Sequence, residues 1–393
     1  MLIKTIFWIL IGTVIYCYAG YTIILAVISW IKYRKKRSIE ADIADSDLPP
    51  ITFVIAAYNE RTLAPEKIMN SFAVDYPESK VFQLWATDGS DDGTPDILNG
   101  IDQLEVQHQP IRKGKTAALN RVMPLVKTPV TIFSDANTTV SQTSAKLIAK
   151  EFLDPMVGCV VGEKRILSDQ SDDAVSSGEG AYWRYESLIK RLESESGSAL
   201  SAAGELYAIR TELYQKIDED IILDDFVESI GIRQKGYKLK YNPDAFAIEK
   251  ASINITEEKK RKRRIAAGAF QTLFRYPGFM NPFRNCYLAF QYISHKVLRW
   301  IVVPFAVFLI PFLNLFIVLK VDNNTIYQVI FILLMFFFAI ALLGWLIKNK
   351  KLKEKIIFIP YYILMMNISI LEGFWLYLTR RQNVVWEKST RQT

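Results

Sequence analysis

The run Ile51-Thr52-Phe53-Val54-Ile55-Ala56-Ala57 leads directly into Tyr58-Asn59-Glu60, and this stretch decides the predicted fold. Its apolar and β-branched residues are typical of a buried strand that ends where the polar residues begin. Residues 81–86, which lead to Asp88, and residues 130–133, which lead to Asp135, repeat the pattern. Helix-length segments at 65–73 and 115–126 separate these strands. We therefore predict an α/β domain with a doubly wound sheet.

The polar ends of these strands are the first candidates for a binding site, because ligands of such sheets bind just past the carboxyl ends of the strands. Ser134-Asp135-Ala136-Asn137 offers oxygen ligands two residues apart, which suit a hard cation that bridges phosphates. Residues 87–94, which read TDGSDDGT, follow the second strand. That run is equally typical of an ordinary Asp/Gly surface turn.

Two further features carry possible chemistry. Asp224 and Asp225 emerge together from the apolar run 221–223, and a helix cap is the alternative interpretation, since Asp caps helices well. Gly114-Lys115 places a cation at the expected start of a helix. It is not a phosphate-binding P-loop, which needs a longer glycine-rich lead.

The ends of the chain are apolar. Residues 5–31 contain no charge, and about 27 residues at 1.5 Å each reach roughly 40 Å, enough to cross a bilayer. The alternative is a cleaved signal peptide, but its apolar core would be about half as long as residues 5–31, so a membrane span is favoured. Basic residues follow the span at 32 and 34–37, which predicts that this end stays in the cytoplasm and the N-terminus outside.

The C-terminal third contains three more apolar stretches, at 300–319, 326–347 and 356–378. The polar link 320–325 is expected outside and the basic link 348–355 inside. The last stretch fits less well, because a crossing would carry Arg380, Arg381, Lys388 and Arg391 to the far side. It is broken, re-entrant or packed against other helices around Glu372. Residues 280–300 are interpreted as an interfacial helix or a linker.

The composition excludes several classes of protein. Three cysteines without paired spacing and two histidines argue against a disulfide framework, a Cys/His zinc site and a His-based triad. The charge balance of 48 basic against 41 acidic residues gives +7, and we expect no nucleic-acid partner. The basic run 259–264 is interpreted as a solvated helix face or a patch on anionic lipid, with Arg264 alone assigned to the site.

These motifs, in this order, resemble the membrane-bound family 2 glycosyltransferases of GT-A fold, which include cellulose, chitin, hyaluronan and poly-N-acetylglucosamine synthases. The resemblance runs from Thr52 to about Gln271. It implies a nucleotide-sugar-binding domain flanked by transmembrane helices, with boundaries at 1–37 for the anchor and its basic flank, 38–280 for the cytoplasmic GT-A domain and 281–393 for the interfacial helix and C-terminal spans. It also implies a plasma-membrane, multi-pass location.

The resemblance assigns roles to individual residues. Asp225 matches the catalytic base, Asp135 and Asn137 the Asp-x-Asp that binds Mg²⁺ or Mn²⁺, and Gly204, Glu205 and Asp224 the acceptor side. Nucleotide-sugar contacts are implied for a larger set, namely Ala57, Tyr58, Asn59, Glu60, Asp88, Lys115, Asp135 and Arg264.

Three departures from the family pattern matter. Thr87 replaces an acid, and Asn137 replaces the second acid of Asp-x-Asp, so that an Asp at 137 is expected to bind metal more tightly. Ile265 replaces the Trp of Gln-x-x-Arg-Trp and cannot stack on an acceptor sugar. Phe270 and Phe274 are the nearby aromatic residues that are candidates to replace it.

We therefore expect an inverting transfer from a nucleoside diphosphate sugar, expected to be UDP-linked, to a growing polysaccharide or glycan. The alternatives are a transferase that adds a single sugar to a lipid-linked acceptor, and a catalytically silent subunit of a polysaccharide secretion complex. A transporter is disfavoured, because four spans with few internal charges make a thin pathway. The sequence leaves the sugar, the acceptor and the linkage open.

Overall fold

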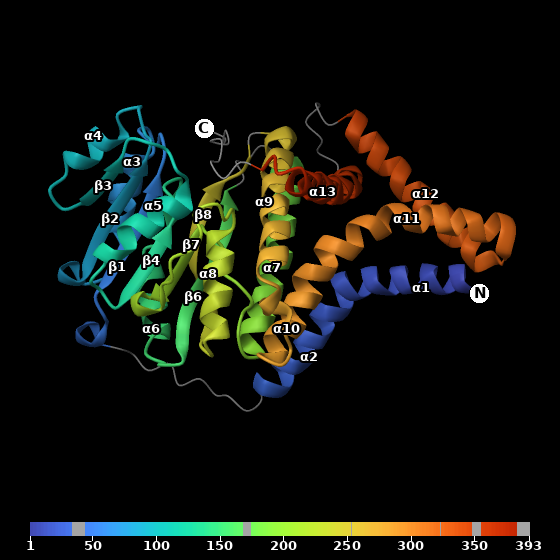
Figure 1. The fold of residues 1–393 in the computed structure, drawn as a ribbon, viewed down its shortest axis with the longest axis horizontal. Helices are drawn as coiled ribbons and strands as arrows, with labels where there is room; N and C mark the ends of the chain where they lie inside the picture. The colour runs from blue at the N-terminus through green and yellow to red at the C-terminus, as the bar shows by residue number, and fades with distance from the viewer. Residues whose placement is uncertain (34–43, 168–173, 253, 323, 348–354, 383–393) are drawn as a thin grey trace.

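A computed structural model describes residues 1–33, 44–167, 174–252, 254–322, 324–347 and 355–382 (Figure 1). Several basic positions discussed above lie outside the described residues, namely 34–37, most of 348–355, Lys388 and Arg391.

The centre of the fold is one eight-stranded sheet in the order β3-β2-β1-β4-β7-β6-β8-β5. The first four strands in this order run parallel, β7 is antiparallel to both of its neighbours, and β6 and β8 are parallel. The strands are β1 Ile51–Ala57, β2 Val81–Asp88, β3 Glu105–Gln109, β4 Val130–Ser134, β5 Thr138–Val140, β6 Val157–Leu167, β7 Leu206–Arg210 and β8 Lys238–Lys250. The predicted strands at 51–57, 81–86 and 130–133 are confirmed as β1, β2 and β4.

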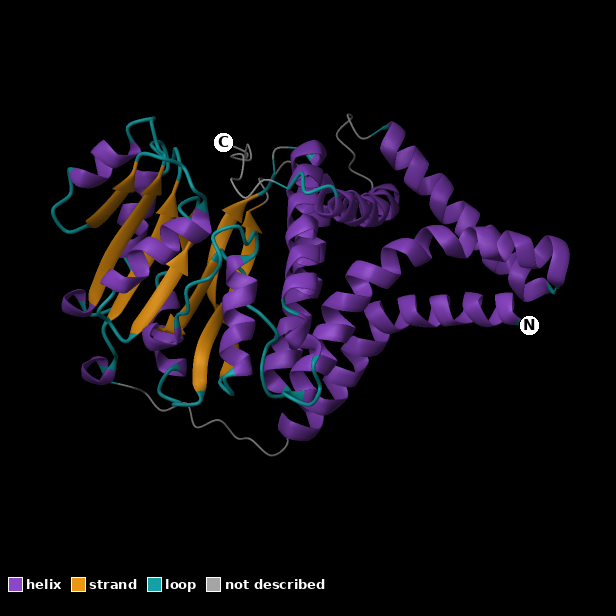
Figure 2. Cartoon of the chain, in the orientation of Figure 1, coloured by secondary structure: helices purple, strands orange, loops and turns teal. Residues whose placement is uncertain are grey.

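Helices cover both faces of the sheet (Figure 2). Alternation along β1 explains why, since Phe53 and Ile55 belong to one apolar cluster and Val54 to the other. The first cluster also takes residues from α3, α4 and α6, and the second from α5 and α8. These helices are α3 Ala64–Phe72, α4 Thr94–Asn99, α5 Lys115–Val122, α6 Ser144–Glu151 and α8 Asp224–Gln234. The doubly wound α/β prediction is confirmed.

Two long helices lie between the sheet and the apolar helices, α7 Ala174–Glu195 and α9 Ile255–Arg275 (Figure 1). The polar composition of residues 168–177 predicts a loop there. This prediction is wrong from Ala174 onward, because α7 begins at that residue, and the residues before it lie outside the described part. The helix expected at 115–126 ends at Val122. Pro124 lies in the 3₁₀ turn that follows.

Within the part of the chain that the structure describes, four helices are long and apolar enough to cross a membrane: Leu2–Lys32, Cys286–Val321, Thr325–Leu346 and Ile357–Leu378. They include all or most of α1 Leu2–Ile15, α2 Tyr21–Tyr33, α10 Cys286–Tyr292, α11 Val303–Phe316, α12 Thr325–Leu346 and α13 Lys355–Leu378. All four apolar stretches predicted as spans are thus helical and of sufficient length. Lys4 pairs with Asp322 at 2.5 Å, so the N-terminus lies beside the turn between α11 and α12.

The segment expected to be an interfacial helix or a linker is continuous with α11 and packs on α7. His295 is buried, with Nδ1 2.8 Å from Glu193 and Nε2 3.2 Å from Glu186. Lys296 and Arg299 pair with Glu186 at 3.0 and 2.7 Å. These contacts fix the start of the apolar helix against the α/β domain.

Helix α13 packs along α9. A Cβ on Gly373 would lie 2.5 Å from the Cβ of Ala266, so the two backbones approach closely. Lys259 and Glu372 pair at 2.6 Å across the same contact. Of the interpretations offered for this stretch, packing around Glu372 is confirmed. Figure 1 shows α13 nearly end-on, whereas α1 and α12 run across the view.

Candidate active site

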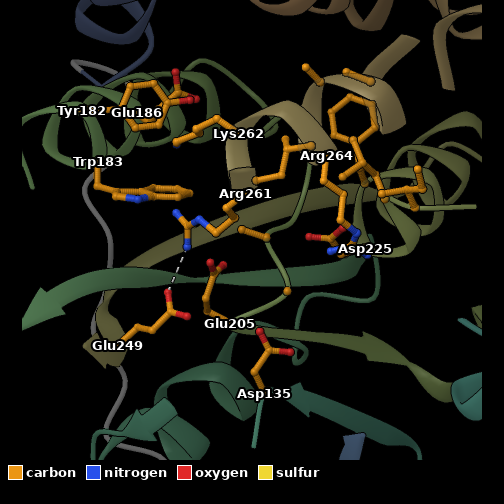
Figure 3. A pocket seen from close by; sticks show the side chains of 18 of the residues that line it. Asp135, Tyr182, Trp183, Glu186, Glu205, Asp225, Glu249, Arg261, Lys262 and Arg264 are labelled. Carbon is orange, nitrogen blue, oxygen red and sulfur yellow. Dashed lines mark ion pairs between the residues drawn. The ribbon is translucent and has the colours of Figure 1, made fainter. Parts of the chain in front are cut away.

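A cavity of about 1380 Å³ opens at the carboxyl ends of β1 and β4 and extends to α7, α9 and α13. Figure 3 shows side chains that point into it, among them Asp135 after β4, Tyr182 of α7 and Arg264 of α9. It brings together most of the residues that the sequence assigned to the site, namely Tyr58, Glu60, Lys115, Asp135, Asn137, Gly204, Glu205, Asp224, Asp225 and Arg264. The predicted site residues Ala57, Asn59 and Asp88 are not among its lining residues.

The loop after β1 is fixed to the loop after β2. Asn59 adopts a positive φ of 53°, and its amide donates to Asp91 at 2.8 Å and accepts from the Asp91 backbone at 3.0 Å. The guanidinium of Arg112 lies 3.3 Å from the ring centre of Tyr58. Asn59 therefore shapes the loop, while Tyr58 and Glu60 line the cavity.

Asp88 positions the start of α5. Its carboxylate is buried and accepts backbone N–H groups from Lys113 at 3.0 Å and Gly114 at 2.6 Å. Gly114 has φ 104°, a conformation that favours glycine. These bonds place Lys115 as the first residue of α5. The expected contact of Asp88 with uridine stays a prediction.

Lys115 is the cation at the centre of the site. Its Nζ lies 2.6 Å from Oδ1 of Asp135. A Cβ added to Gly204 would lie 3.0 Å from this Nζ and 3.6 Å from Oδ2 of Asp225, so Gly204 lies against both groups. Burial lowers the pKa of Lys115, but Asp135, Asp224 and Asp225 raise it further in total, so the amine stays charged.

Asp224 and Asp225 are in the first turn of α8, after the cap residue Leu223, and no side chain caps the helix. The helix-cap interpretation is therefore wrong. Burial first, and the charge of Asp224 second, raise the pKa of Asp225 to about 7, while Lys115 opposes this shift. Arg264 extends from α9 toward Asp225 (Figure 3). Burial lowers the pKa of Arg264, and the carboxylates of Asp224, Asp225 and Asp135 counter this effect.

The donor set at the end of β4 fits a hard divalent cation. Asp135 and Asn137 both line the cavity and offer a carboxylate and an amide carbonyl. No cluster of three or more His, Cys, Asp or Glu side chains suited to a metal occurs among the residues that the structure describes. Mg²⁺ is commonly held by one or two protein oxygens together with substrate phosphates and water, so two ligands suffice.

The structure corrects the sequence interpretation of the basic run 259–264 at Arg261 and Lys262, whereas Lys260 is exposed. Arg261 and Lys262 face neither solvent nor lipid. Arg261 pairs with Glu179 at 3.0 Å and Glu249 at 3.5 Å, and Lys262 lies 3.5 Å from Glu258 and 4.2 Å from the ring centre of Tyr182 (Figure 3). Both basic residues line the cavity.

The sequence reasoning also missed Lys164 and Glu249. Lys164 is 1% exposed and pairs with Glu205 at 2.5 Å and with Glu249. Burial raises the pKa of Glu205, but the Lys164 ammonium holds it well below its usual range. The available signal was the presence of charged residues inside two strand-like runs, 157–167 and 238–250, since a charge that is buried there needs a partner.

The aromatic residues at the acceptor end differ from those expected. Phe270 is buried against Phe374, with 4.8 Å between ring centres, and Phe274 stacks on Tyr377 at 5.4 Å. Neither lines the cavity, so neither replaces the missing Trp at Ile265. Tyr182 and Trp183 of α7 do line it.

Comparison with known proteins decides the class. Residues 49–275, more than half of the chain, match the family described as "Glycosyltransferase like family 2". The chain belongs to this family. The match ends with the last residue of α9, so it contains the whole sheet and the helices α3 to α9.

Relatives in the family include the poly-β-1,6-N-acetyl-D-glucosamine synthase of Staphylococcus aureus, 28% identical over 253 residues. This match covers 62% of the chain and 59% of the relative's length. The synthase of Staphylococcus epidermidis is 24% identical, with 67% and 66% covered. A mannosyltransferase from Pyrobaculum calidifontis, solved with GDP-mannose and Mn²⁺, has the same fold, with a TM-score of 0.70, 19% identity, and 95% and 99% of the two chains covered.

Proposed function

We propose that this chain is a membrane-embedded, inverting glycosyltransferase that moves a sugar from a nucleoside diphosphate sugar to a hydroxyl group of a glycan acceptor. One observation carries the proposal. Asp225, with its pKa raised to about 7, shares a single cavity with Lys115, Asp135 and Arg264. The proposed base, Asp225, and the proposed anion-binding residues, Lys115 and Arg264, therefore line one cavity at the carboxyl ends of the parallel strands.

In the proposed reaction the acceptor hydroxyl attacks the anomeric carbon and the nucleoside diphosphate leaves from the opposite face. Asp225 accepts the hydroxyl proton as the new bond forms. Lys115 and Arg264 bind the diphosphate and stabilise the charge that builds up on it. Gly204 leaves the space between Lys115 and Asp225 in which the reacting groups meet.

The proposed cofactor is Mg²⁺ or Mn²⁺, held by Asp135 and Asn137. Bound there, the ion would neutralise the leaving diphosphate. The Mn²⁺ in the Pyrobaculum structure supports this choice by analogy of fold. Lys115 takes part by holding Asp135 in place through their 2.6 Å contact.

A second candidate function is transfer of one sugar to a lipid-linked acceptor. The observation that favours it is an apolar stripe along α13, where Ile359, Ile363, Met366 and Ile370 line the cavity at helical spacing. A hydrocarbon chain fits such a wall better than a polar glycan does. The absence of an aromatic residue at Ile265 points in the same direction.

The proposed arrangement places the catalytic domain in the cytoplasm, where nucleotide sugars are made, and embeds the flanking helices in the plasma membrane. The domain limits 1–37, 38–280 and 281–393 are part of this proposal. The long apolar helices and their positions at both ends of the chain support it. Further subunits of a secretion complex are compatible with it.

The decisive experiment incubates the purified full-length chain in lipid nanodiscs with radiolabelled UDP- and GDP-sugars and sizes the products. Lipid-phosphate and oligosaccharide acceptors are supplied in separate reactions. Transfer that is lost in Asp225→Asn supports the enzyme. A protein that binds nucleotide sugar but transfers nothing to either acceptor would instead be the silent subunit.

A further inference from the structure

We propose that Glu249 is a positioning residue that turns the side-chain amide of Asn137 so that its carbonyl oxygen faces the metal site. The inference rests on the proposed metal-dependent transfer and explains why this chain carries Asn where the family pattern has an acid. Nothing in the sequence motif itself points to Glu249, which lies more than a hundred residues further along the chain.

The sheet brings the two residues together. Asn137 immediately precedes β5, and the register of β5 with β8 sets Thr138 opposite Glu249. The Nδ2 of Asn137 lies 3.2 Å from Oε1 of Glu249. An ionised carboxylate only accepts hydrogen bonds, so the amide must present its NH₂ group to Glu249. Its carbonyl oxygen is thereby directed away from Glu249, on a side chain that lines the cavity.

Glu249 is itself held firmly. It is 3% exposed, and its second oxygen, Oε2, pairs with Lys164 and lies 3.5 Å from Arg261 (Figure 3). Lys164 also binds Glu205, so Lys164 connects Glu249, beside the metal-side loop, to the acceptor side of the site. With Oε2 occupied by cations, Oε1 is the oxygen that orients Asn137.

This arrangement changes the expectation for an acid at position 137. The sequence alone suggests that Asn137→Asp restores a ligand and tightens metal binding. Next to Glu249, the new carboxylate would face a second carboxylate at the distance of a hydrogen bond, and like charges there oppose each other. The benefit is expected only when position 249 becomes a donor.

A polarity swap tests the inference. In Asn137→Asp/Glu249→Gln the acceptor and donor exchange places, so the hydrogen bond is retained with the same net charge, and one oxygen of the new carboxylate at position 137 faces the cavity. In Glu249→Gln alone, the new amide can hydrogen-bond either end of Asn137 and no longer dictates its orientation. Loss of such outer-shell support commonly costs about 10- to 100-fold in metal affinity.

The readout is Mn²⁺ affinity of the full-length protein in nanodiscs, measured by electron paramagnetic resonance of free Mn²⁺ with and without UDP. This measurement needs no turnover, so it is independent of the transfer assay. We expect Glu249→Gln to weaken binding about tenfold or more, Asn137→Asp to give no gain over wild type and to bind more weakly than the double variant, and the double variant to recover at least the wild-type affinity. Glu163→Gln is the matched control, because Glu163 is a part-buried strand carboxylate that binds Ser187 and lies outside the cavity.

Three results among the variants would overturn the inference. They are a Glu249→Gln affinity within twofold of wild type, an Asn137→Asp affinity equal to that of the double variant, and no recovery in the double variant. Thermal unfolding of each variant without metal accompanies the titrations. If Glu249→Gln does not fold, the comparison of Asn137→Asp with wild type still decides, since a clear gain in affinity there contradicts the role of Glu249. Wild-type protein that binds no Mn²⁺ with or without UDP also overturns it.

Discussion

Nζ of Lys115 lies 2.6 Å from Oδ1 of Asp135, so the cation expected to bind the donor diphosphate is paired with the carboxylate expected to bind the metal. Asp224 and Asp225 also act on Lys115, and together the three carboxylates keep its amine charged. The Lys115 ammonium thus offsets the negative charge of Asp135 at the proposed donor end and that of Asp225, the proposed general base. Its removal should be felt in two separate measurements.

Lys115→Met is expected to weaken donor binding by about tenfold or more, because a hydrogen bond to a charged group contributes roughly 1.5–3 kcal/mol. It should also raise the pKa of Asp225 further, since Lys115 lowers it. The KM for the donor and the pH profile of kcat/KM check both effects. Lys113→Met is the control, because this exposed residue contacts Asp88 through its backbone. Equal effects of the two variants would contradict the assignment.

Asp225→Asn is expected to lower turnover by about 10² to 10⁴ while nucleotide binding is retained, because it removes the base and little of the diphosphate site. Transfer rates and nucleotide titrations in the same preparation separate the two properties. Asp220→Asn serves as control, since Asp220 is exposed and pairs with Arg275 at 2.6 Å, away from the base. Near-wild-type turnover in Asp225→Asn would remove Asp225 from the mechanism.

The pH dependence follows from the raised pKa of Asp225, about 7. A general base works only when unprotonated, so kcat/KM should be level above this pH and fall tenfold per pH unit below it. In Asp224→Asn the negative charge that raises the pKa of Asp225 is gone. The acidic limb of the kcat/KM profile, where the rate falls, should therefore move to lower pH. A limb that stays in place in Asp224→Asn would show that another group controls it.

The sequence predicts the parts of this site that follow strands directly. Residues after β1 and β4 meet because parallel neighbours end at the same edge, and the strand patterns at 51–57 and 130–133 are unambiguous. The family pattern adds Asp225 and Arg264, which lie far along the chain. No local pattern predicts that Glu249 faces Asn137, because that contact depends on the register of β5 with β8.

The basic run 259–264 is a second example of a feature that a local sequence pattern does not predict correctly. A run of basic residues on a helix is usually a solvated face, yet Arg261 and Lys262 point inward here. The cause is a set of three buried carboxylates: Glu249 on β8, Glu179 on α7 and Glu258 at the start of α9. A buried carboxylate is stable only when it is paired with a cation, and Arg261 pairs with all three. These partners come from elements that are separated in the sequence and adjacent only in the fold.

Ile265→Trp is expected to lengthen the products, because Ile265 lines the cavity next to Arg264 and an aromatic face there contributes on the order of 1 kcal/mol to acceptor retention. Product sizing by gel electrophoresis compares wild type, Ile265→Trp and the ring-free control Ile265→Val. If the wild type adds one or a few sugars while Ile265→Trp gives longer products, the missing Trp limits chain extension. Long polymer from the wild type would show that the missing Trp does not limit chain extension in this protein.

The final prediction concerns α13, whose two ends both meet the same cavity. Ile359 lines it near the start of the helix, and Arg381 and Gln382 line it just after the end. The pair between Lys259 and Glu372 holds the second half of α13 on α9. Because both ends of α13 lie at the same cavity, we expect that this helix does not carry the chain to the far side. We therefore expect the residues after α13 to stay on the side of the catalytic domain, as the positive charges at 380 and 381 favour.

Cysteine labelling with an impermeant reagent tests this topology in a Cys286→Ser background, since Cys286 is the exposed native thiol among the three cysteines. Asn324→Cys, between α11 and α12, should label in intact cells. Glu219→Cys in the catalytic domain and Arg380→Cys after α13 should label only after permeabilisation, because both positions then share the cytoplasmic side. Labelling of Arg380→Cys in intact cells, with Glu219→Cys still protected, would mean that α13 crosses the membrane. The expectation based on its contacts with α9 would then be wrong.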